Sequence, residues 1–388
     1  MGKSNPHICF ISQQVYCYLT DGNYESAGGA ERQQYLLGKE LRRRGFEISY
    51  ITGDYGGLGE ETIDSITLKR SIPMNVGFSG AHKKFLGLFR AMRNLNADIY
   101  YVRSSLVLFI FATAISKIIN KRIVYVVASD QTVEPERLDD LEHGWFSNIS
   151  MKRLTQPIIK RLYLRSVGDA DQVITLTNHQ KQVLQEEYDI PATVVPVGYD
   201  LPPADDILDP SEREYFFWAG RLTPDKHPDT FLDAAAQLPD EEFVMAGPKG
   251  GHPEFTERVI KTASSMDNVT YIGYVKPTTI HEYFKKSMGF IQTTGTTAGF
   301  GNTTLEAWRF ATPVVSLHSN FDGTIEQREL GLYADGSVDL LAEHIEALSD
   351  SPEQIDKYGW NGREYLDDHF SLASIGDSYE EILTDVVG

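Results

Sequence analysis

The sequence predicts an α/β protein of two domains, each built around a parallel β-sheet. Short apolar runs, typical of buried strands, alternate with longer amphipathic segments, and this alternation occurs twice along the chain. A stretch rich in proline and acidic residues, 199–213, separates the two series and has the composition of a linker. A chain of 388 residues is long enough for two domains that each bury a core.

The first series predicts strands at residues 7–12, 47–52, 66–70, 98–102, 122–127 and 171–177. Helices are expected at 31–44, 82–94 and 106–119 and from the last strand to 187, and Gly45 is suited to end the first helix. Residues 193–198 close this series. Because the strands alternate with helices, the sheet should be parallel, covered on both faces, and bind ligands at the carboxyl ends of its strands.

The second series predicts strands at residues 214–220, 243–247, 268–275, 290–294 and 312–315. Helices are expected at 228–238, from about 302, at 338–348 and 352–366, and at the end of the chain to about 387. The second domain therefore repeats the arrangement of the first.

The net charge of −19 is unevenly distributed. Residues 1–200 carry 23 Lys and Arg against 22 Asp and Glu, whereas residues 201–388 carry 13 against 33. An acidic half argues against nucleic acid as a partner. The two cysteines, Cys9 and Cys17, give no disulfide framework and favour a reducing compartment.

The expected localisation is cytoplasmic. The apolar run after Lys3 is short and broken by Gln13 and Gln14, unlike a signal peptide. The most apolar segment, 106–115, is far below the roughly 20 residues needed to span a bilayer.

The most informative stretch runs from Ala298 to Trp308. Its glycines, Gly299 and Gly301, bracket a turn that leads into a helix, and helix N-termini attract anions. Glu306 follows Asn302 by about one helical turn and could hold hydroxyls of the same ligand. The pattern favours a ligand with phosphate and sugar character, and an ordinary junction with a solvated Glu is the alternative.

A second candidate site follows the strand at 214–220. Arg221 and Lys226 are two cations at the carboxyl end of that strand, just before a helix N-terminus. Cations are unfavourable at the positive end of a helix, so their presence suggests that an anion binds there. An ordinary charged loop is the alternative.

Two further candidates lie in the first half. Gly28 and Gly29 precede a helix and could receive a phosphate or simply form a tight turn, and no G-x-G-x-x-G occurs in the chain. Asp130 follows the strand at 122–127, so it is either a site residue or a turn-forming Asp.

Two stretches are basic and amphipathic, 83–93 and 152–165. Such stretches can rest on an anionic membrane surface, or they can be surface helices whose inner faces lie in the core. Asp169 and Asp171 match the Asp-x-Asp of metal-dependent sugar transferases, but they lie at the start of a strand. We therefore expect no metal there, and no His, Cys or Glu cluster has metal-ligand spacing.

The order and spacing of several motifs resemble a known family. These motifs are Gly28-Gly29-Ala30-Glu31, residues 194–200, Gly220 through Lys226, Ala246-Gly247-Pro248, Gly273-Tyr274-Val275, and Gly299-Phe300-Gly301 through Glu306-Ala307 to Thr312-Pro313-Val314-Val315. The chain thereby resembles the retaining nucleotide-sugar glycosyltransferases of GT-B fold, glycosyltransferase family 4 (group 1).

The resemblance implies two facing Rossmann-like domains with a cleft between them. Residues 1–198, completed by a C-terminal helix at about 372–388, would form the acceptor side, and residues 199–371 would bind the nucleotide-sugar. No cofactor or metal is implied, because Arg221 and Lys226 correspond to residues that neutralise the donor diphosphate.

The resemblance also assigns the other donor contacts. Glu306 corresponds to the residue that holds the ribose, and Tyr274 and Val275 to the loop beside the base. The backbone around Gly299, Phe300, Gly301, Asn302 and Thr303 would lie against the sugar and phosphates, and Gly28, Gly29 and Gly220 complete the predicted donor site.

The chain departs from the family pattern at two positions. Ala298 replaces the first of two glutamates spaced eight positions apart, which grips the donor sugar. We therefore expect an altered donor sugar, or help from Thr297 or Asn302. In the first domain Ser129-Asp130 stands where the family often has a His, so Asp130 is predicted to orient the acceptor.

The predicted function is retaining, metal-independent transfer of a sugar from a nucleoside-diphosphate sugar to a glycan or lipid-linked acceptor, in polysaccharide or glycoconjugate biosynthesis. The alternative is a catalytically inactive nucleotide-sugar-binding subunit, which Ala298 suggests. Because of the basic stretches, we also expect peripheral contact of the protein with the inner face of an anionic membrane.

Overall fold

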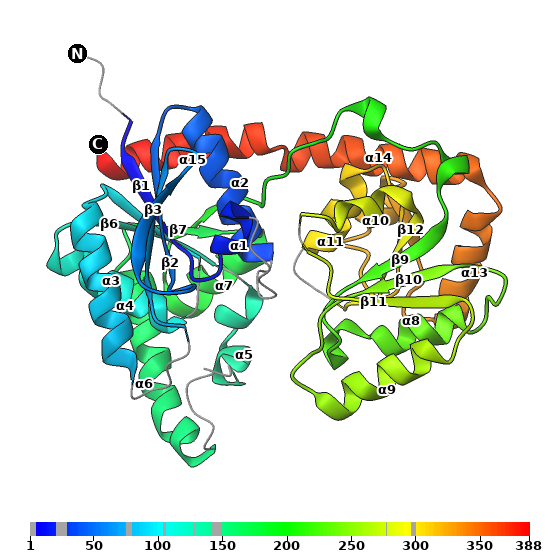
Figure 1. Cartoon of the computed structure of the whole chain (residues 1–388), viewed down its shortest axis with the longest axis horizontal. Helices are drawn as coiled ribbons and strands as arrows, with labels where there is room; N and C mark the ends of the chain where they lie inside the picture. The colour runs from blue at the N-terminus through cyan, green and yellow to red at the C-terminus, as the bar shows by residue number, and fades with distance from the viewer. Residues whose placement is uncertain are drawn as a thin grey trace. The chain divides into compact units, whose positions relative to one another are not determined.

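The computed structural model describes residues 5–20, 29–74, 80–103, 106–127, 129–140, 149–276, 278–295 and 300–388. The chain divides into two compact units (Figure 1). Unit 1 comprises residues 1–198 together with 372–388, and unit 2 comprises residues 199–371.

Unit 1 is built on an eight-stranded sheet in the order β3-β4-β2-β1-β5-β6-β7-β8. Every neighbouring pair is parallel except β3 and β4, which form an antiparallel hairpin. The strands are β1 His7–Ile11, β2 Glu47–Gly53, β3 Gly59–Ile63, β4 Ile66–Ile72, β5 Ile99–Val102, β6 Arg122–Val126, β7 Gln172–Thr175 and β8 Thr193–Val194. The antiparallel edge strand β3 was not expected from the sequence.

Helices cover both faces of this sheet, and each face has its own core. Its helices include α1 Tyr16–Leu19, α2 Gly29–Arg43, α3 Ala81–Leu95, α4 Leu106–Ile118, α5 Pro135–Asp140, α6 Ile149–Gly168, α7 Asn178–Tyr188 and α15 Leu372–Val387. One core joins the sheet to α3, α4, α6 and α7 through residues such as Leu88, Phe109 and Tyr163. The other joins it to α2 and α15 through residues such as Leu41 and Tyr379. Parallel strands buried on both faces explain the near-continuous apolar runs.

The C-terminal helix α15 is fixed to unit 1 by polar contacts as well as by the core. Arg44, just after α2, donates to Asp377 at 2.5 Å and to Glu380 at 2.9 Å, and its guanidinium also binds the carbonyl of Ala373. The hydroxyls of Tyr101 and Tyr379 lie 3.3 Å apart. The last segment of the chain therefore completes the first unit.

Unit 2 has a six-stranded sheet in the order β11-β10-β9-β12-β13-β14, and all its pairs are parallel. The strands are β9 Tyr215–Ala219, β10 Phe243–Ala246, β11 Val269–Gly273, β12 Ser287–Gln292, β13 Val314–Ser316 and β14 Gly331–Tyr333. Its α-helices include α8 Pro228–Ala235, α9 Pro253–Ser264, α10 His281–Lys286, α11 Asn302–Arg309, α12 Thr324–Gln327, α13 Val338–Ser349 and α14 Pro352–Phe370. In this unit the order of the strands reverses between β9 and β12.

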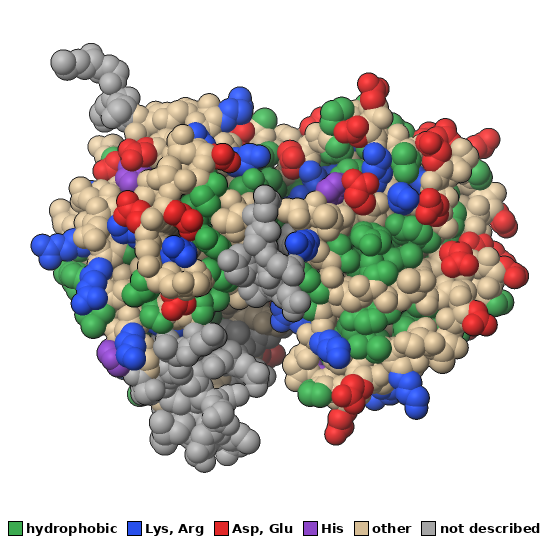
Figure 2. All heavy atoms as spheres, viewed as in Figure 1, with side chains coloured by type: hydrophobic (Ala, Val, Ile, Leu, Met, Phe, Trp, Pro, Cys, Tyr) green, Lys and Arg blue, Asp and Glu red, His purple; other side chains and the backbone are tan. Residues whose placement is uncertain are grey.

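The surface reflects the uneven charge of the sequence. Figure 2 shows acidic side chains spread over unit 2. In unit 1, helices α3, α4 and α6 contain Lys and Arg but no Asp or Glu. None of the described helices is both long and apolar enough to cross a membrane.

Candidate active site

The candidate site of unit 2 lies at the carboxyl edge of its sheet, where β9 and β12 are neighbours. Residues Gly220 to Lys226 follow β9, and Thr293 follows β12. The buried Trp218 indole donates to the Thr293 hydroxyl at 2.8 Å, and that hydroxyl donates to the Lys226 carbonyl at 2.7 Å. These two hydrogen bonds fix the loop that carries Arg221 and Lys226 to the end of β12.

Two backbones approach closely at the same edge. A Cβ atom added to Gly247, directly after β10, would overlap the carbonyl oxygen of Gly220. Gly247 has φ +157°, in the region that favours glycine. The amide of Gly220 donates to the carbonyl of Ala246 at 3.0 Å, and the amide of Gly247 donates to the carbonyl of Gly273 at 2.7 Å. Glycines therefore let the turns after β9, β10 and β11 pack together.

The two predicted cations lie on this loop and reach solvent. Arg221 is exposed, and among the described residues its guanidinium makes no hydrogen bond or ion pair. Lys226 is 38% exposed and lies 3.6 Å from the carboxylate of Asp225. Burial acts to raise the pKa of Asp225, but the Thr223 hydroxyl and the Lys226 charge outweigh it and lower that pKa. Two cations, Arg221 and Lys226, against the one carboxylate of Asp225 leave the loop with a net positive charge for an anionic ligand.

Helix α11 begins at the predicted position and presents its N-terminus without a side-chain cap. Gly301 is the N-cap residue in an extended conformation, and its carbonyl accepts from the Thr304 amide at 3.0 Å. The first amides of the helix are the kind that bind anions. The hydroxyl of Tyr199, from the start of unit 2, donates to the Asn302 side chain at 2.9 Å and fixes the helix start.

Glu306 is buried on α11 instead of being solvated, with 5% of its surface exposed. Its Oε2 accepts from Arg309 at 2.9 Å. Arg309 is equally buried and also binds the carbonyl and carboxylate of Asp200, at 2.7 and 2.8 Å. The alternative of a solvated Glu is therefore wrong, and the carboxylate is held in a fixed orientation.

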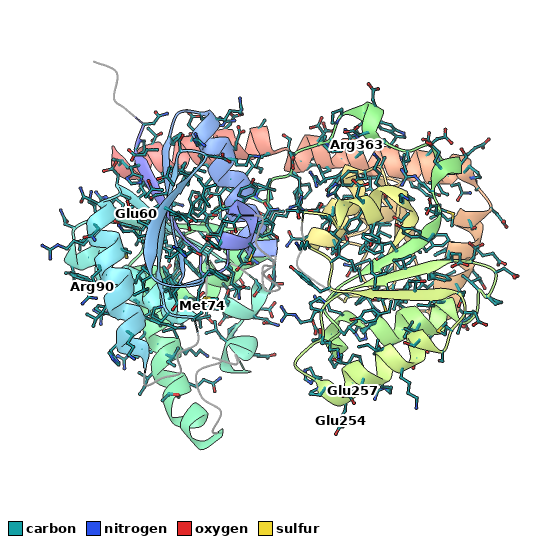
Figure 3. All side chains as sticks on the ribbon, viewed as in Figure 1. Glu60, Met74, Arg90, Glu254, Glu257 and Arg363 are labelled. Carbon is teal, nitrogen blue, oxygen red and sulfur yellow. The ribbon has the colours of Figure 1, made fainter. Side chains whose placement is uncertain are left out.

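Sequence reasoning missed Arg309. Its spacing from Glu306, three residues along a helix, was a usable signal for an ion pair. Its second partner, Asp200, lies 109 residues away in the sequence and gave no such signal. Arg363 of α14, labelled in Figure 3, donates to the carbonyls of Arg309 and Pro202. It thereby helps to hold the backbone of Arg309 in place.

Phe300, predicted to lie against the donor, packs its ring into an aromatic cluster. The centroid of the Phe300 ring lies 4.2 Å from Phe321, 4.8 Å from Trp308, 5.7 Å from Tyr365 and 6.0 Å from Phe370. Any contact of Phe300 with a donor at this edge is therefore left to its backbone, and the ring anchors the turn before α11.

The other predicted donor residues are placed as follows. Tyr274 and Val275 follow β11 at the same edge, next to the turn of Gly273. Thr303 is the second residue of α11. Gly28, Thr297, Ala298 and Gly299 lie outside the described residues, and Gly29 is the first residue of α2 in unit 1.

Asp130 lies in unit 1, in a 3₁₀ turn at Asp130–Thr132 after β6. Its Oδ1 accepts from the buried Gln180 amide at 2.9 Å. Its carbonyl accepts from the Val133 and Glu134 amides, at 3.0 and 2.9 Å. Asp130 thus both forms the turn and presents a fixed carboxylate, so the structure leaves both predicted roles open.

A histidine pair beside Lys226 was not predicted. His227 has φ +49°, a left-handed conformation that costs a non-glycine residue energy, and its ring lies 5.4 Å from that of His318. His318 follows β13, and burial together with His227 lowers the pKa of its imidazole. The pair adds two imidazoles to the site edge, and the lowered pKa favours the neutral form of His318.

The carboxylates of the Asp-x-Asp sequence are engaged by cations of unit 1. Asp169 pairs with Lys117 at 2.6 Å, and Asp171 pairs with Arg122 at 2.7 Å. The described residues contain no group of three or more His, Cys, Asp and Glu that could hold a metal ion.

Each unit matches one protein-family model. Residues 27–202 match the model described as Glycosyltransferase Family 4, and residues 205–365 match the model described as Glycosyl transferases group 1. The chain therefore belongs to the family 4, group 1 glycosyltransferases, which are transferase enzymes. The predicted family is confirmed.

Curated relatives match parts of the chain. The D-inositol 3-phosphate glycosyltransferase of Mycolicibacterium gilvum is 29% identical over 166 residues, which cover 39% of this chain and 37% of that protein. The alpha-D-kanosaminyltransferase of Streptomyces kanamyceticus is 23% identical over 258 residues, which cover 61% and 66%. The chain therefore matches only part of the length of each relative.

Solved structures match over almost the whole chain. Sucrose-phosphate synthase from Thermosynechococcus elongatus has a TM-score of 0.76 at 18% identity, covering 98% of this chain and 99% of that one. HepE of Anabaena, solved with UDP-glucose, has a TM-score of 0.71 at 15% identity, covering 98% and 100%. These likenesses confirm the predicted GT-B fold class.

Proposed function

We propose that the chain transfers a sugar, with retention, from a nucleoside-diphosphate sugar to a glycan or lipid-linked acceptor without a metal ion. The observation that carries this proposal is the carboxyl edge of unit 2, where exposed Arg221 and Lys226, the α11 N-terminus and an oriented Glu306 belong to neighbouring strand ends. The solved complexes of HepE with UDP and with UDP-glucose support a nucleotide-sugar donor for a protein of this fold.

In this proposal the bond from the sugar's anomeric carbon to the diphosphate breaks, and a bond to the acceptor oxygen forms on the same face. Charge grows on the leaving diphosphate. Arg221, Lys226 and the first amides of α11 stabilise that charge from fixed positions, which is the effect expected to lower the barrier most. Glu306 accepts hydrogen bonds from the ribose hydroxyls, and Arg309 keeps its carboxylate in place.

Asp130 is proposed to orient the acceptor hydroxyl and to help receive its proton. Its carboxylate is fixed by the Gln180 amide, as a group that must meet a substrate needs to be. Asp130→Asn should lower kcat for transfer about 100-fold, the effect typical of a general base, while leaving donor binding unchanged. Wild-type transfer by Asp130→Asn would end this assignment.

Ala298 suggests a donor sugar whose hydroxyls differ from those of common hexoses. Ala298→Glu should then shift preference toward common hexose donors, measured as a change in the ratio of kcat/KM for two donors. If Ala298→Glu raises turnover on common hexose donors without changing that preference, the altered-donor proposal is wrong.

A screen of nucleotide-sugars by thermal shift tests the donor, because a ligand that binds only the folded state raises Tm. Slow hydrolysis of the stabilising nucleotide-sugar by the purified protein supports the enzyme. Tight binding of a nucleotide-sugar, with neither hydrolysis nor transfer to any offered acceptor, supports the alternative of an inactive binding subunit.

We also propose peripheral contact of unit 1 with an anionic membrane, as suits a lipid-linked acceptor. Helices α3, α4 and α6 pack together on one face of the sheet. Their outer surfaces expose Leu86, Ile118, Ile158 and Leu162 among Lys83, Arg90, Arg93 and Arg161, in a chain of net charge −19. Arg90 points outward from α3 (Figure 3). Apolar side chains beside cations suit an anionic lipid surface.

Vesicle flotation tests this contact. Binding to vesicles with an anionic phospholipid should fall with salt and with neutralisation of Lys83, Arg90, Arg93 and Arg161, each worth about 1 kcal/mol near such a surface. Neutralising Arg258 on unit 2 is the matched control. Absence of flotation at low salt would contradict the proposal.

A further inference from the structure

A small cavity in unit 1 contains a buried cation that none of the described residues neutralises. The cavity has a volume of about 10 Å³, room for one water-sized group. Its lining includes Gln33, Tyr101, Arg103, Gly198 and Tyr379, and none of its lining residues is Asp or Glu. Arg103 follows β5 directly, at the edge of the sheet where ligands bind in open α/β folds.

Arg103 has 5% of its surface exposed, and its Nε has no hydrogen-bond partner among the described residues. Its guanidinium also makes no ion pair with the described part of the chain, whereas its backbone carbonyl accepts from Gln34 at 3.2 Å. A buried charge without a partner costs several kcal/mol.

The other buried arginines differ from Arg103 because each has acceptors. Arg213 donates to the carbonyls of Ser287, Phe310 and Ala311 and to the hydroxyl of Thr312. Arg309 and Arg363 bind carboxylates or carbonyls, as described above. The missing acceptor of Arg103 is therefore not a general feature of buried arginines in this fold.

Gln33 supplies a second unused donor in the same cavity. Its Oε1 accepts from the Gly198 amide at 3.1 Å, which sets the orientation of the side-chain amide. In the described part of the chain its Nε2 then has no partner, although Gln33 is only 5% exposed. Two buried donors, one of them charged, thus line one space and have no acceptor among the residues that the structure describes.

The two phenols that line the cavity do not neutralise Arg103. Burial raises the pKa of Tyr101 and raises that of Tyr379 well above the usual value, while the Arg103 charge opposes both shifts. Both phenols are therefore neutral at physiological pH, and the guanidinium lies close enough to influence them.

We propose that Arg103 and Gln33 form an anion subsite in unit 1, which receives one oxygen of a phosphate or carboxylate carried by the acceptor. The cavity volume of about 10 Å³ fits one oxygen atom, so the other oxygens of the group would lie at the open side of the cavity. The acceptor's identity rests on the proposed transferase function, whereas the anion subsite itself does not.

Thermal shift and calorimetry with inorganic phosphate and a hexose phosphate test the subsite on the full chain. Both should raise the Tm of the wild-type protein, with tighter binding of the hexose phosphate. Arg103→Met should weaken binding about tenfold or more, because a hydrogen bond to a charged group is lost. Arg258→Met, on an exposed helix of unit 2, is the matched control and should bind as the wild type does.

Two variants separate an anion subsite from a structural arginine. Without added anion, Arg103→Met should melt no lower than the wild type, because it removes an unpaired buried charge. Gln33→Glu keeps the side-chain shape and places a carboxylate beside Arg103. It should raise Tm and abolish the phosphate response.

The proposal is overturned if Arg103→Met lowers Tm and leaves anion binding unchanged, or if Gln33→Glu still responds to phosphate. Equal responses to chloride, phosphate and hexose phosphate would show a simple ion site and overturn the acceptor assignment. Hydrolysis of a nucleotide-sugar by the wild-type protein without acceptor tests the transferase proposal separately. Absence of this hydrolysis would contradict the transferase proposal and leave the anion subsite standing.

Discussion

The buried pair of Glu306 and Arg309 gives the sharpest prediction for the stability of the site. Both side chains are nearly inaccessible, with 7% and 8% exposed, and they lie 2.9 Å apart. Arg309→Met would leave the Glu306 carboxylate buried without its cation, which typically costs 3–5 kcal/mol. The bond to Asp200 adds about 0–1 kcal/mol, since that carboxylate is 56% exposed and screened by solvent.

The double variant Glu306→Gln with Arg309→Met tests the cause of this loss. Without the carboxylate, no buried charge remains at the pair, so the double variant should be less destabilised than the sum of the two single variants. A coupling free energy of about 2 kcal/mol is expected for contacting residues of this kind. Donor binding should fall in every variant that lacks the Glu306 carboxylate or its orientation.

Urea denaturation followed by tryptophan fluorescence is the assay. Three of the four tryptophans, Trp218, Trp308 and Trp360, belong to unit 2, and Trp308 is adjacent to Arg309. Most of the signal therefore follows the unit that contains the pair. If Arg309→Met changes the free energy of unfolding by less than about 0.5 kcal/mol, as a surface substitution would, or if the two substitutions are additive, the reasoning is refuted.

Three other substitutions test the structure. Gly247→Ala should destabilise unit 2 by about 3 kcal/mol in urea denaturation, because the added Cβ would overlap the Gly220 carbonyl. Gly251→Ala is the control and should be neutral, because a Cβ there meets open space. Equal effects of the two substitutions would contradict this prediction. Burial lowers the pKa of Arg213 to about 10, so the guanidinium is still charged at neutral pH. Arg213→Met should lower the free energy of unfolding by about 3 kcal/mol, because buried carbonyls lose their donor. An unchanged urea midpoint would argue against this role. Burial lowers the pKa of His7 against the opposing charges of Glu47 and Asp98. The unfolded chain therefore binds the proton more readily, so stability is lost as pH falls below about 6.5. His7→Gln should flatten the dependence of Tm on pH, measured by melting curves between pH 5 and 7.5. Identical slopes of Tm against pH in the variant and the wild type would contradict this prediction.

The alternation of apolar runs and amphipathic segments predicted the two parallel sheets well, because strands buried on both faces must be continuously apolar. The short strand β3 was missed because Gly59–Ile63 is polar and exposed along most of its length. The three-residue strand β14 is too short to give a pattern. Pro157 lies inside helix α6, where sequence rules favour a helix boundary.

The site was predictable where its residues follow strand ends directly. Arg221 and Lys226 are examples because they follow β9, and Glu306 was placed by the predicted start of α11, since strand and helix boundaries can be located from local patterns. The bond from Arg309 to Asp200, which helps to hold Glu306 in place, and the burial of Arg103 depend on contacts between distant segments. The direction of the Phe300 ring likewise depends on Tyr365 and Phe370 of α14, which no local pattern indicates.

The central claim, that the carboxyl edge of unit 2 binds a nucleoside diphosphate through fixed cations, is tested most directly by calorimetry with UDP and other nucleoside diphosphates. Arg221→Ala and Lys226→Ala should each weaken binding about tenfold or more, since each removes a charge-assisted bond. Arg258→Ala, on the same unit, should bind as the wild type does. Unchanged affinity in both Arg221→Ala and Lys226→Ala would contradict the account.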